Sequence, residues 1–151
     1  MTKLEKNNVF MERAFAAAEA TTCTREDRRI GAVAVRDGVV IAEAANGLPE
    51  GLKMKTCKQR GYCARKKMNI ASGTAPCVPY CICGEQKLLA KAAREGISVD
   101  GADVYATHKP CSTCIKLLIC AGVKRVFYRD DYPDKITDDI VKQAEFALVR
   151  V

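Results

Sequence analysis

The sequence Cys83-Gly84-Glu85, followed at residues 110–114 by Pro-Cys-Ser-Thr-Cys, decides which fold and which chemistry we expect of this chain. Cys83, Cys111 and Cys114 have the residue type and spacing of zinc ligands, and three protein ligands leave the fourth position of a tetrahedral zinc open for water. Glu85 would lie beside the metal without being needed as a ligand. An open zinc site next to a carboxylate predicts hydrolytic chemistry. The alternative is a structural zinc knuckle, which needs a fourth protein ligand.

These ligands fall at the starts of two predicted helices. Cys111 and Cys114 are three residues apart in the first turn of a helix expected over 111–121, so both sulfurs lie on one face. Cys83 begins a helix expected over 83–95, and a single zinc site requires that the two helix starts meet. The partial positive charge at helix N-termini lowers thiol pKa and favours the ionised sulfurs that bind zinc.

The rest of the chain predicts an α/β fold. Two β-prone runs, 30–36 and 39–45, are joined by Asp37-Gly38, which is typical of a two-residue hairpin turn. Residues 46–82 have little periodicity and are expected to form a long ordered loop, which in a compact domain is usually functional. The other expected elements are a helix from Asn7 or Asn8 to Ala20, strands at 102–107, 124–128 and 148–151, and a helix over 134–147. Strands linked through helices after a hairpin predict a sandwich with a mixed sheet.

The composition is that of an ordinary globular protein. The 151 residues are expected to form one domain, 1–151, and no apolar run is long enough to span a membrane. The charged N-terminus lacks the apolar segment of a signal peptide, so we expect a cytoplasmic protein. In a reducing compartment, nine cysteines argue for metal binding rather than disulfides. Cys120, within an apolar run, is instead expected to be a buried hydrophobe.

The net charge of +7 comes from one segment. Between Gly51 and Gly84 there are seven basic residues and no acidic one, whereas the rest of the chain carries 18 of each. A local excess of positive charge attracts phosphate, although a solvated loop would have the same composition. The seven basic residues are Lys53, Lys55, Lys58, Arg60, Arg65, Lys66 and Lys67.

Several motifs in order carry a family resemblance. The zinc motifs have the form His/Cys-x-Glu followed by Pro-Cys-x-x-Cys, which is the signature of zinc deaminases. The other matching stretches are 30–38, 46–51, 69–73, 107–111 and 126–132. From Cys23 to Tyr132 the chain resembles the cytidine/deoxycytidylate deaminase superfamily, most closely the deoxycytidylate (dCMP) deaminases and their ComEB-like relatives. The resemblance implies a three-layer α/β/α cytidine-deaminase-like sandwich with a mixed sheet, and a homo-oligomer.

The resemblance also implies an activity and a set of site residues. The chain is expected to be a zinc-dependent hydrolase, with Zn²⁺ as its cofactor, that deaminates a cytosine-containing mononucleotide, dCMP to dUMP first. Glu85 would carry protons while a zinc-activated water attacks C4 of the ring. Asn46 would bond the sugar hydroxyl or the base, unless it is only the first residue of a type I′ turn. Backbone around Gly84 would contact the pyrimidine edge.

Two further side chains are expected near the nucleotide. Tyr132 is one, with a core or edge aromatic as the alternative. The other is one of Arg25, Arg28 and Arg29, and Arg29 is the candidate that we take forward.

The first zinc motif departs from the family pattern, which usually reads His-Ala-Glu. Three thiolates on Zn²⁺ leave a net charge of −1, which makes a weaker Lewis acid than a His-Cys-Cys site. We therefore expect a compensating donor, either an arginine or the N–H groups of the helix starts. Glycine in place of alanine at position 84 is expected to leave more room beside the base.

The cysteines outside the triad are expected to hold a second, structural zinc, as in some dCMP deaminases. Cys23 and Cys57 fall in places similar to that family's ligands, and Cys63 with either Cys77 or Cys81 completes a set of four. Such a site would staple the long loop. The alternative is that these cysteines are free buried thiols.

Other functions fit the same motifs. One alternative substrate is cytidine, deoxycytidine or another nucleobase, and another is tRNA or single-stranded DNA. The basic segment favours nucleic acid, but it offers few aromatic side chains for base stacking. A third class is a non-catalytic zinc module that senses nucleotides, against which the presence of Glu85 is the main argument.

Overall fold

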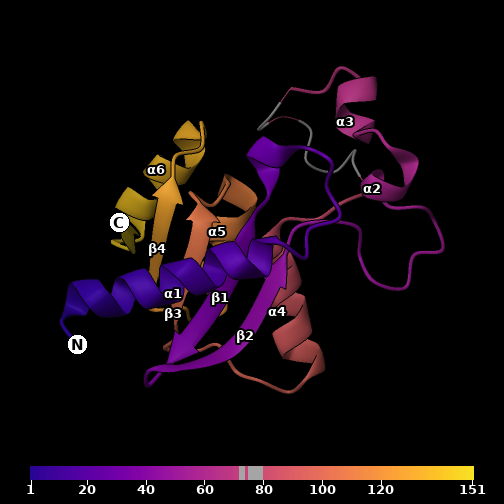
Figure 1. Cartoon of the computed structure of the whole chain (residues 1–151). Helices are drawn as coiled ribbons and strands as arrows, with labels where there is room; N and C mark the ends of the chain where they lie inside the picture. The colour runs from indigo at the N-terminus through magenta and orange to yellow at the C-terminus, as the bar shows by residue number, and fades with distance from the viewer. Residues whose placement is uncertain (72–73, 75–79) are drawn as a thin grey trace.

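The computed structural model describes residues 1–71, 74 and 80–151 and contains a five-stranded sheet flanked by helices (Figure 1). The strand order is β2-β1-β3-β4-β5. Strand β1 (Gly31–Arg36) is antiparallel to both β2 (Val39–Ala45) and β3 (Asp103–His108). Strands β4 (Arg125–Asp130) and β5 (Ala147–Arg150) continue the sheet parallel to β3. The expected α/β fold with a mixed sheet is confirmed.

Helix α1 (Lys3–Ala18) covers one face of this sheet, and Figure 1 shows it crossing the strands. Met11 and Ala14 are fully buried there, in one cluster with Val33 and Phe127. The helix approaches β1 most closely at Gly31, where a Cβ atom would lie 2.1 Å from the carbonyl oxygen of Ala14. Any larger residue at this position would therefore push the helix away from the sheet.

The opposite face is covered by α4 (Gly84–Arg94), α5 (Ser112–Cys120) and α6 (Lys135–Gln143). Leu88 of α4 and Leu118 of α5 are fully buried against Val104 and Val126 of the central strands. Ile140 of α6 is half-buried against the same cluster. Helices on both faces of one sheet make the three layers that the sequence predicted.

The strand directions bring three chain segments to one edge of the sheet. Because β1 and β3 are antiparallel, with Ala32 opposite Ala106, the start of β1 lies beside the end of β3. The end of β2 lies at the same edge, since Gly31 pairs with Ala45. Helix α5 follows β3 at this edge, and the start of α4 is held next to the end of β2.

The terminal helices differ from expectation in their bounds. Helix α1 begins at Lys3 rather than near Asn7, because Thr2 and Glu5 form a capping box one turn earlier. It ends at Ala18 rather than Ala20. Helix α6 ends at Gln143 rather than Ala147, because Glu145 adopts a left-handed φ of 49° that a helix cannot continue through.

The segment 46–82 is more regular than expected. It contains two short helices, α2 (Cys57–Arg60) and α3 (Ala64–Lys67), which Figure 1 shows to one side of the sheet. Helix α2 starts at a capping box between Thr56 and Gln59 and ends at Gly61, which has a φ of 76°. These start and stop signals are present in the sequence. Cys77 lies outside the described residues.

Helix α5 corrects one expectation. Cys120 is exposed, as is Leu117, so the prediction of a buried cysteine at 120 is wrong. The helix buries Cys114, Ile115 and Leu118, which share one face at a spacing of three and four residues, and this leaves position 120 on the other face. Within the described part of the chain, no helix has the length and apolarity that crossing a membrane requires.

Candidate active site

Cys83 is fixed at the start of α4 by the residues on either side of it. Ile82 forms a two-bond bridge with Gly47, which follows β2, at N···O distances of 2.9 and 3.1 Å. Cys83 itself is the N-cap of α4, and its sulfur accepts from the backbone N–H of Gln86. The Gln86 side chain accepts in return from the Cys83 N–H at 3.1 Å. The first predicted ligand is thus tied to the end of β2.

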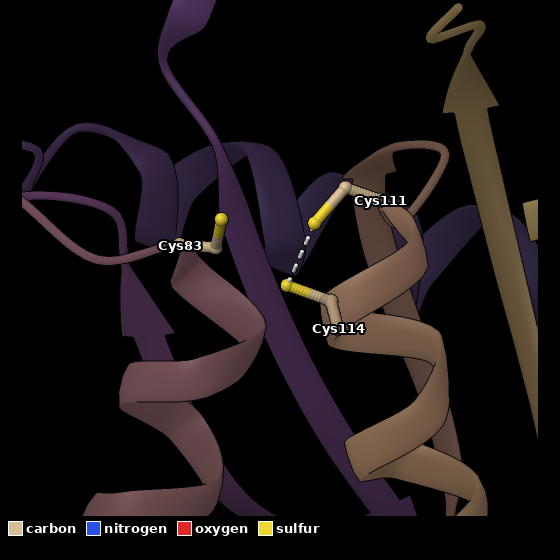
Figure 2. A group of neighbouring side chains, drawn as sticks. All are labelled: Cys83, Cys111 and Cys114. Carbon is tan, nitrogen blue, oxygen red and sulfur yellow. Dashed lines mark hydrogen bonds between the residues drawn. The ribbon is translucent and has the colours of Figure 1, made fainter. Parts of the chain in front are cut away.

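Cys111 and Cys114 come from the start of α5, where Cys111 is the N-cap and Cys114 lies in the first turn. Their sulfurs are 3.5 Å apart, and the sulfurs of all three cysteines lie within 4.8 Å of one another. Figure 2 shows the three side chains gathered between the two helix starts. Sulfurs bound to one tetrahedral zinc at 2.3 Å are about 3.8 Å apart, so this triad fits a zinc ion. The predicted meeting of the helix starts is confirmed.

The helix starts also donate hydrogen bonds to the sulfurs. Hydrogen bonds from Cys114 and Cys83, and from the backbone N–H groups of Cys114 and Thr113, lower the pKa of Cys111 well below its ordinary value, against the effect of burial. Hydrogen bonding to the Cys111 sulfur raises the pKa values of Cys83 and Cys114, so without a metal Cys111 is the one thiolate that the triad favours. The sequence predicted either an arginine or the N–H groups of the helix starts as the compensating donor. The N–H groups of the helix starts are present.

Glu85 is buried beside the triad, with 3% of its surface exposed. Burial, with a smaller contribution from the charge of the Cys111 sulfur, raises the pKa of Glu85 to about 7. Hydrogen bonds from its own backbone N–H and from the Cys114 thiol act in the opposite direction. The carboxyl group therefore lies within hydrogen-bonding reach of the metal ligands, in the first turn of α4, as its position two residues after Cys83 predicted.

Comparison with known proteins agrees with this geometry. The sequence profile described as "Cytidine and deoxycytidylate deaminase zinc-binding region" matches residues 4–130. The chain belongs to the cytidine and deoxycytidylate deaminase family. Its members bind zinc through this region, and the cysteine triad is placed to hold that metal.

Several relatives resemble this chain over most of its length. ComE operon protein 2 of Bacillus subtilis is 32% identical over 138 residues, covering 87% of the chain, and the match spans 63% of that longer protein. Deoxycytidylate deaminase of Mycobacterium phage D29 is 32% identical over 130 residues, covering 85% of the chain and 97% of the phage protein. The crystal structure of dCMP deaminase from cyanophage S-TIM5 in complex with dCMP and dUMP superposes with a TM-score of 0.79 at 28% identity, over the full length of both chains.

A cavity of about 200 Å³ opens above the triad and Glu85. Its walls include Asn46 and Tyr132, which were expected near the nucleotide, and also Arg25 and Arg28, two of the three arginines among which one was expected there. Arg29 does not line the cavity and instead faces Glu19 at 3.4 Å. The reason is local: a 3₁₀ turn at Glu26–Arg28 directs Arg28 inward, and the following residue points away.

Arg28 and Tyr132 meet at the cavity wall, with the guanidinium carbon 5.2 Å from the ring centroid. Burial raises the pKa of Tyr132, as do the charges of Cys111 and Cys83, while Arg28 and Arg65 lower it. Tyr132 is therefore not a core aromatic. Its ring contacts Arg28, and its phenol group is close enough to Cys111 and Cys83 for their charges to act on it.

The side chain of Asn46 connects the strand ends. Its Oδ1 accepts from the Thr21 hydroxyl at 2.7 Å and from the Ile30 N–H at 3.0 Å, and its Nδ2 donates to the Arg28 carbonyl at 2.8 Å. Asn46 does not have the positive φ of a type I′ turn, so the turn interpretation is wrong. Asp37 and Gly38, with φ of 53° and 77°, form that turn instead.

Gly84 does not leave the room that its lack of a side chain suggests. A Cβ atom there would lie 3.0 Å from the Ile30 carbonyl oxygen and 3.4 Å from the Asn46 backbone nitrogen. Glycine thus lets the start of α4 approach the backbone of β1 and β2, rather than opening space in the cavity.

Four more cysteines share the cavity wall: Cys23, Cys57, Cys63 and Cys81. The sulfurs of Cys57 and Cys81 are 4.0 Å apart. The charges of Cys57 and Cys63 both raise the pKa of Cys23, after the larger effect of burial, which places all of these thiols in one neighbourhood. Among the described residues only the Cys83 triad has three candidate ligand atoms within 4.8 Å, so these sulfurs would have to draw closer to bind an ion.

The sequence did not single out Asp134, which supports the triad from outside. One of its carboxylate oxygens accepts from the Ser112 N–H at 2.7 Å, next to Cys111. The other caps α6 by accepting from Ile136 and Thr137. The position of Asp134 just before a predicted helix marks it as an N-cap. Its contact with Ser112 joins residues 22 positions apart, and no local sequence pattern reveals it.

Proposed function

We propose that this chain is a zinc-dependent hydrolase that deaminates dCMP to dUMP. The observation that carries the proposal is that Cys83, Cys111 and Cys114 gather in one triad, and that Cys83, Cys111 and the buried Glu85 line one cavity. The D29 protein is named a deoxycytidylate deaminase, and the S-TIM5 structure holds dCMP and dUMP. At about 30% identity these names support the choice of substrate for this chain.

The residues of the chain then have distinct tasks. The chemistry that a bound zinc supplies at such a site is the activation of a water molecule as a nucleophile at neutral pH. Glu85 takes one proton from the attacking water and gives it to N3 of the cytosine ring. It then takes the remaining proton from the hydroxyl on C4 and passes it to the amine, so that ammonia leaves as the C4 carbonyl forms. Because Glu85 is buried, it makes these transfers without competition from bulk water.

The cavity wall orients the nucleotide. The backbone at Gly84 lies at the start of α4, where N–H groups can contact the pyrimidine edge. Asn46 has two of its side-chain atoms engaged by the protein, so a sugar or base would be contacted through the second hydrogen of Nδ2. Tyr132 and Arg28, which contact each other, both line the cavity and would lie beside the nucleotide.

Replacement of Glu85 tests this function. In zinc-loaded protein, Glu85→Gln is expected to lower kcat for dCMP by roughly 10²- to 10⁴-fold, the range for loss of a general acid–base group, while the zinc content stays that of the wild type. Glu95→Gln, at the exposed C-cap of the same helix, is the matched control. Ammonia release from dCMP and zinc content by atomic absorption are the two measurements. Undiminished turnover in Glu85→Gln, or no turnover of dCMP by the wild type, would contradict the proposal.

We also propose that a second, structural zinc is held by Cys23, Cys57, Cys63 and Cys81. These cysteines come from the segment before β1 and from the segment 46–82, so one ion would join the two. The 4.0 Å between the sulfurs of Cys57 and Cys81 is close to the spacing of about 3.8 Å in a four-sulfur zinc site. Arg60 donates to Cys57 at 3.4 Å and would offset part of the charge of four thiolates.

A further inference from the structure

Lys109 is a buried cation beside the active site. Its side chain is 8% exposed, and no other lysine or arginine in the part of the chain that the structure describes is buried. It lines the cavity and lies two residues before Cys111 of the triad. Taking an ammonium group out of water costs free energy unless groups of the protein replace the water. The partners of Lys109 therefore indicate what this residue does.

Two carboxylates face the Lys109 ammonium group. Its Nζ lies 2.6 Å from Oδ1 of Asp138, in the first turn of α6, and 4.0 Å from Oδ1 of Asp131. The two aspartate side chains are 63% and 64% exposed, so they reach inward from the surface to the buried lysine. Because two carboxylates already neutralise its charge, we expect Lys109 to act on these neighbours rather than on the charge of a ligand.

The Asp131 carboxylate connects Lys109 to Tyr132. The oxygen of Asp131 that faces Lys109, Oδ1, also accepts from the Tyr132 N–H at 2.9 Å. Tyr132 lies in the stretch 131–134, between the end of β4 and the start of α6, which is neither helix nor strand. Its position therefore depends on individual contacts and not on a regular backbone ladder. Its ring lines the cavity and contacts Arg28.

Other hydrogen bonds fix the chain on either side of this stretch. The Lys109 N–H donates to the Asp130 carbonyl at 2.8 Å, at the end of β4. The buried hydroxyl of Thr137, in the first turn of α6, donates to the Pro110 carbonyl at 3.1 Å. These bonds hold the residues before and after the stretch 131–134, whereas the Lys109 side chain acts within it, next to Tyr132.

We propose that Lys109 is a positioning residue that holds Tyr132 against the bound nucleotide through Asp131. The inference rests on the proposed function, because it assigns how one wall of that substrate site is kept in place. Without the ammonium group, the exposed Asp131 carboxylate loses the cation that draws it inward, and the Tyr132 N–H loses a fixed acceptor. The stretch 131–134 then has to be ordered when the nucleotide binds, which weakens binding. The chemistry at Glu85 is unchanged.

The kinetics of dCMP deamination test this role. Lys109→Met removes the charge and keeps an unbranched side chain, and it is expected to raise KM about 3- to 10-fold, the effect of ordering one side chain on binding. The value of kcat should stay within about 2-fold of the wild type. Asp131→Ala breaks the same connection at an exposed position, so it should raise KM by about 3-fold or more even if Lys109→Met folds poorly. Lys135→Met removes the same charge from an exposed residue nearby and should change KM by less than about 2-fold.

A double-mutant cycle separates positioning from a general structural role. If Lys109 acts through Tyr132, then Lys109→Met in a Tyr132→Ala background changes KM by less than about 2-fold, because the group that it positions is gone. An equal rise in KM with and without the tyrosine would overturn the proposal. A fall in kcat together with loss of zinc would also overturn it, since the effect would then lie at Cys111. Zinc content and melting temperature are measured for every variant.

Hydrogen exchange distinguishes failure of this inference from failure of the proposed function. Mass spectrometry of the peptide that contains residues 131–134 follows the Tyr132 N–H without any substrate. Exchange of this peptide should be about 10-fold faster in Lys109→Met and in Asp131→Ala than in the wild type and in Lys135→Met. If the wild type fails to deaminate dCMP, the proposed function fails, while this pattern of exchange still supports the positioning role. Exchange that is the same in all four proteins overturns it.

Discussion

Replacement of Asp134 is expected to destabilise the protein and to loosen its metal centre, although this residue binds no metal. Its carboxylate accepts from Ser112 at the start of α5 and caps α6. Loss of an N-cap costs about 1 kcal/mol, and loss of a hydrogen bond to a charged group about 1.5–3 kcal/mol. Because Asp134 is only partly buried, water replaces some of this, and we expect Asp134→Ala to cost about 2–4 kcal/mol in total. For a chain of this size the melting temperature falls by about 5–15 °C.

Two variants divide this cost. Asparagine caps helices as well as aspartate does, so Asp134→Asn should keep the α6 cap and lose only the charged contact with Ser112, at about 1–2 kcal/mol. Asp139→Ala, on the exposed side of α6, is the control and should cost less than about 0.5 kcal/mol. Urea unfolding of the zinc-loaded protein measures these differences. Zinc transfer to a chelator should be faster in Asp134→Ala than in Asp139→Ala, since outer groups that hold a ligand typically contribute 10- to 100-fold in metal affinity. Equal stability and equal zinc release in the two alanine variants would refute the reasoning.

Two further changes probe the packing of α1 and the second metal site. Gly31→Ala would place a Cβ atom 2.1 Å from the Ala14 carbonyl oxygen and 2.6 Å from the Ala18 nitrogen, so α1 must move. Urea unfolding should show that the free energy of unfolding falls by about 3 kcal/mol. A fall of less than about 1 kcal/mol would mean that the helix shifts freely. Wild-type protein is expected to bind two zinc ions per chain, and the Cys81→Ser variant to bind only one tightly. The control variant Cys120→Ser alters an exposed cysteine and should still bind two. A wild-type content of one zinc ion per chain would contradict the second site.

Local patterns predicted most of the elements and the three zinc ligands. The hairpin turn at Asp37-Gly38 follows from the left-handed backbone that such a turn needs. The placing of Cys111 and Cys114 on one helix face follows from helical periodicity alone. The capping boxes at Thr2 and Thr56 are equally local, and the start of α1 and the presence of α2 could have been predicted from them.

The sequence could not show which side chains turn toward the cavity. Arg28 and Arg29 are adjacent and chemically identical, and only the 3₁₀ turn before β1 places Arg28 on Tyr132 and Arg29 on Glu19. The same holds for Arg60 and Arg65 among seven basic neighbours. Charge fixes how strongly a segment attracts an anion, but the direction of each side chain depends on the backbone that carries it.

Sequence alone predicted the three cysteines of the triad, the acid beside them and the order of strands and helices along the chain, because each is carried by a short motif or a local periodicity. The tertiary structure decided that Asn46 holds the strand ends, that Gly84 packs on backbone, and that Asp134 joins α5 to α6. These contacts link residues 16 or more positions apart because antiparallel β1 and β2 bring Ile30 beside Asn46, and because the parallel strands β3 and β4 end side by side, before Ser112 and Asp134. Pairings of that kind are set by the packing of the whole sheet and its helices, which no local spacing encodes.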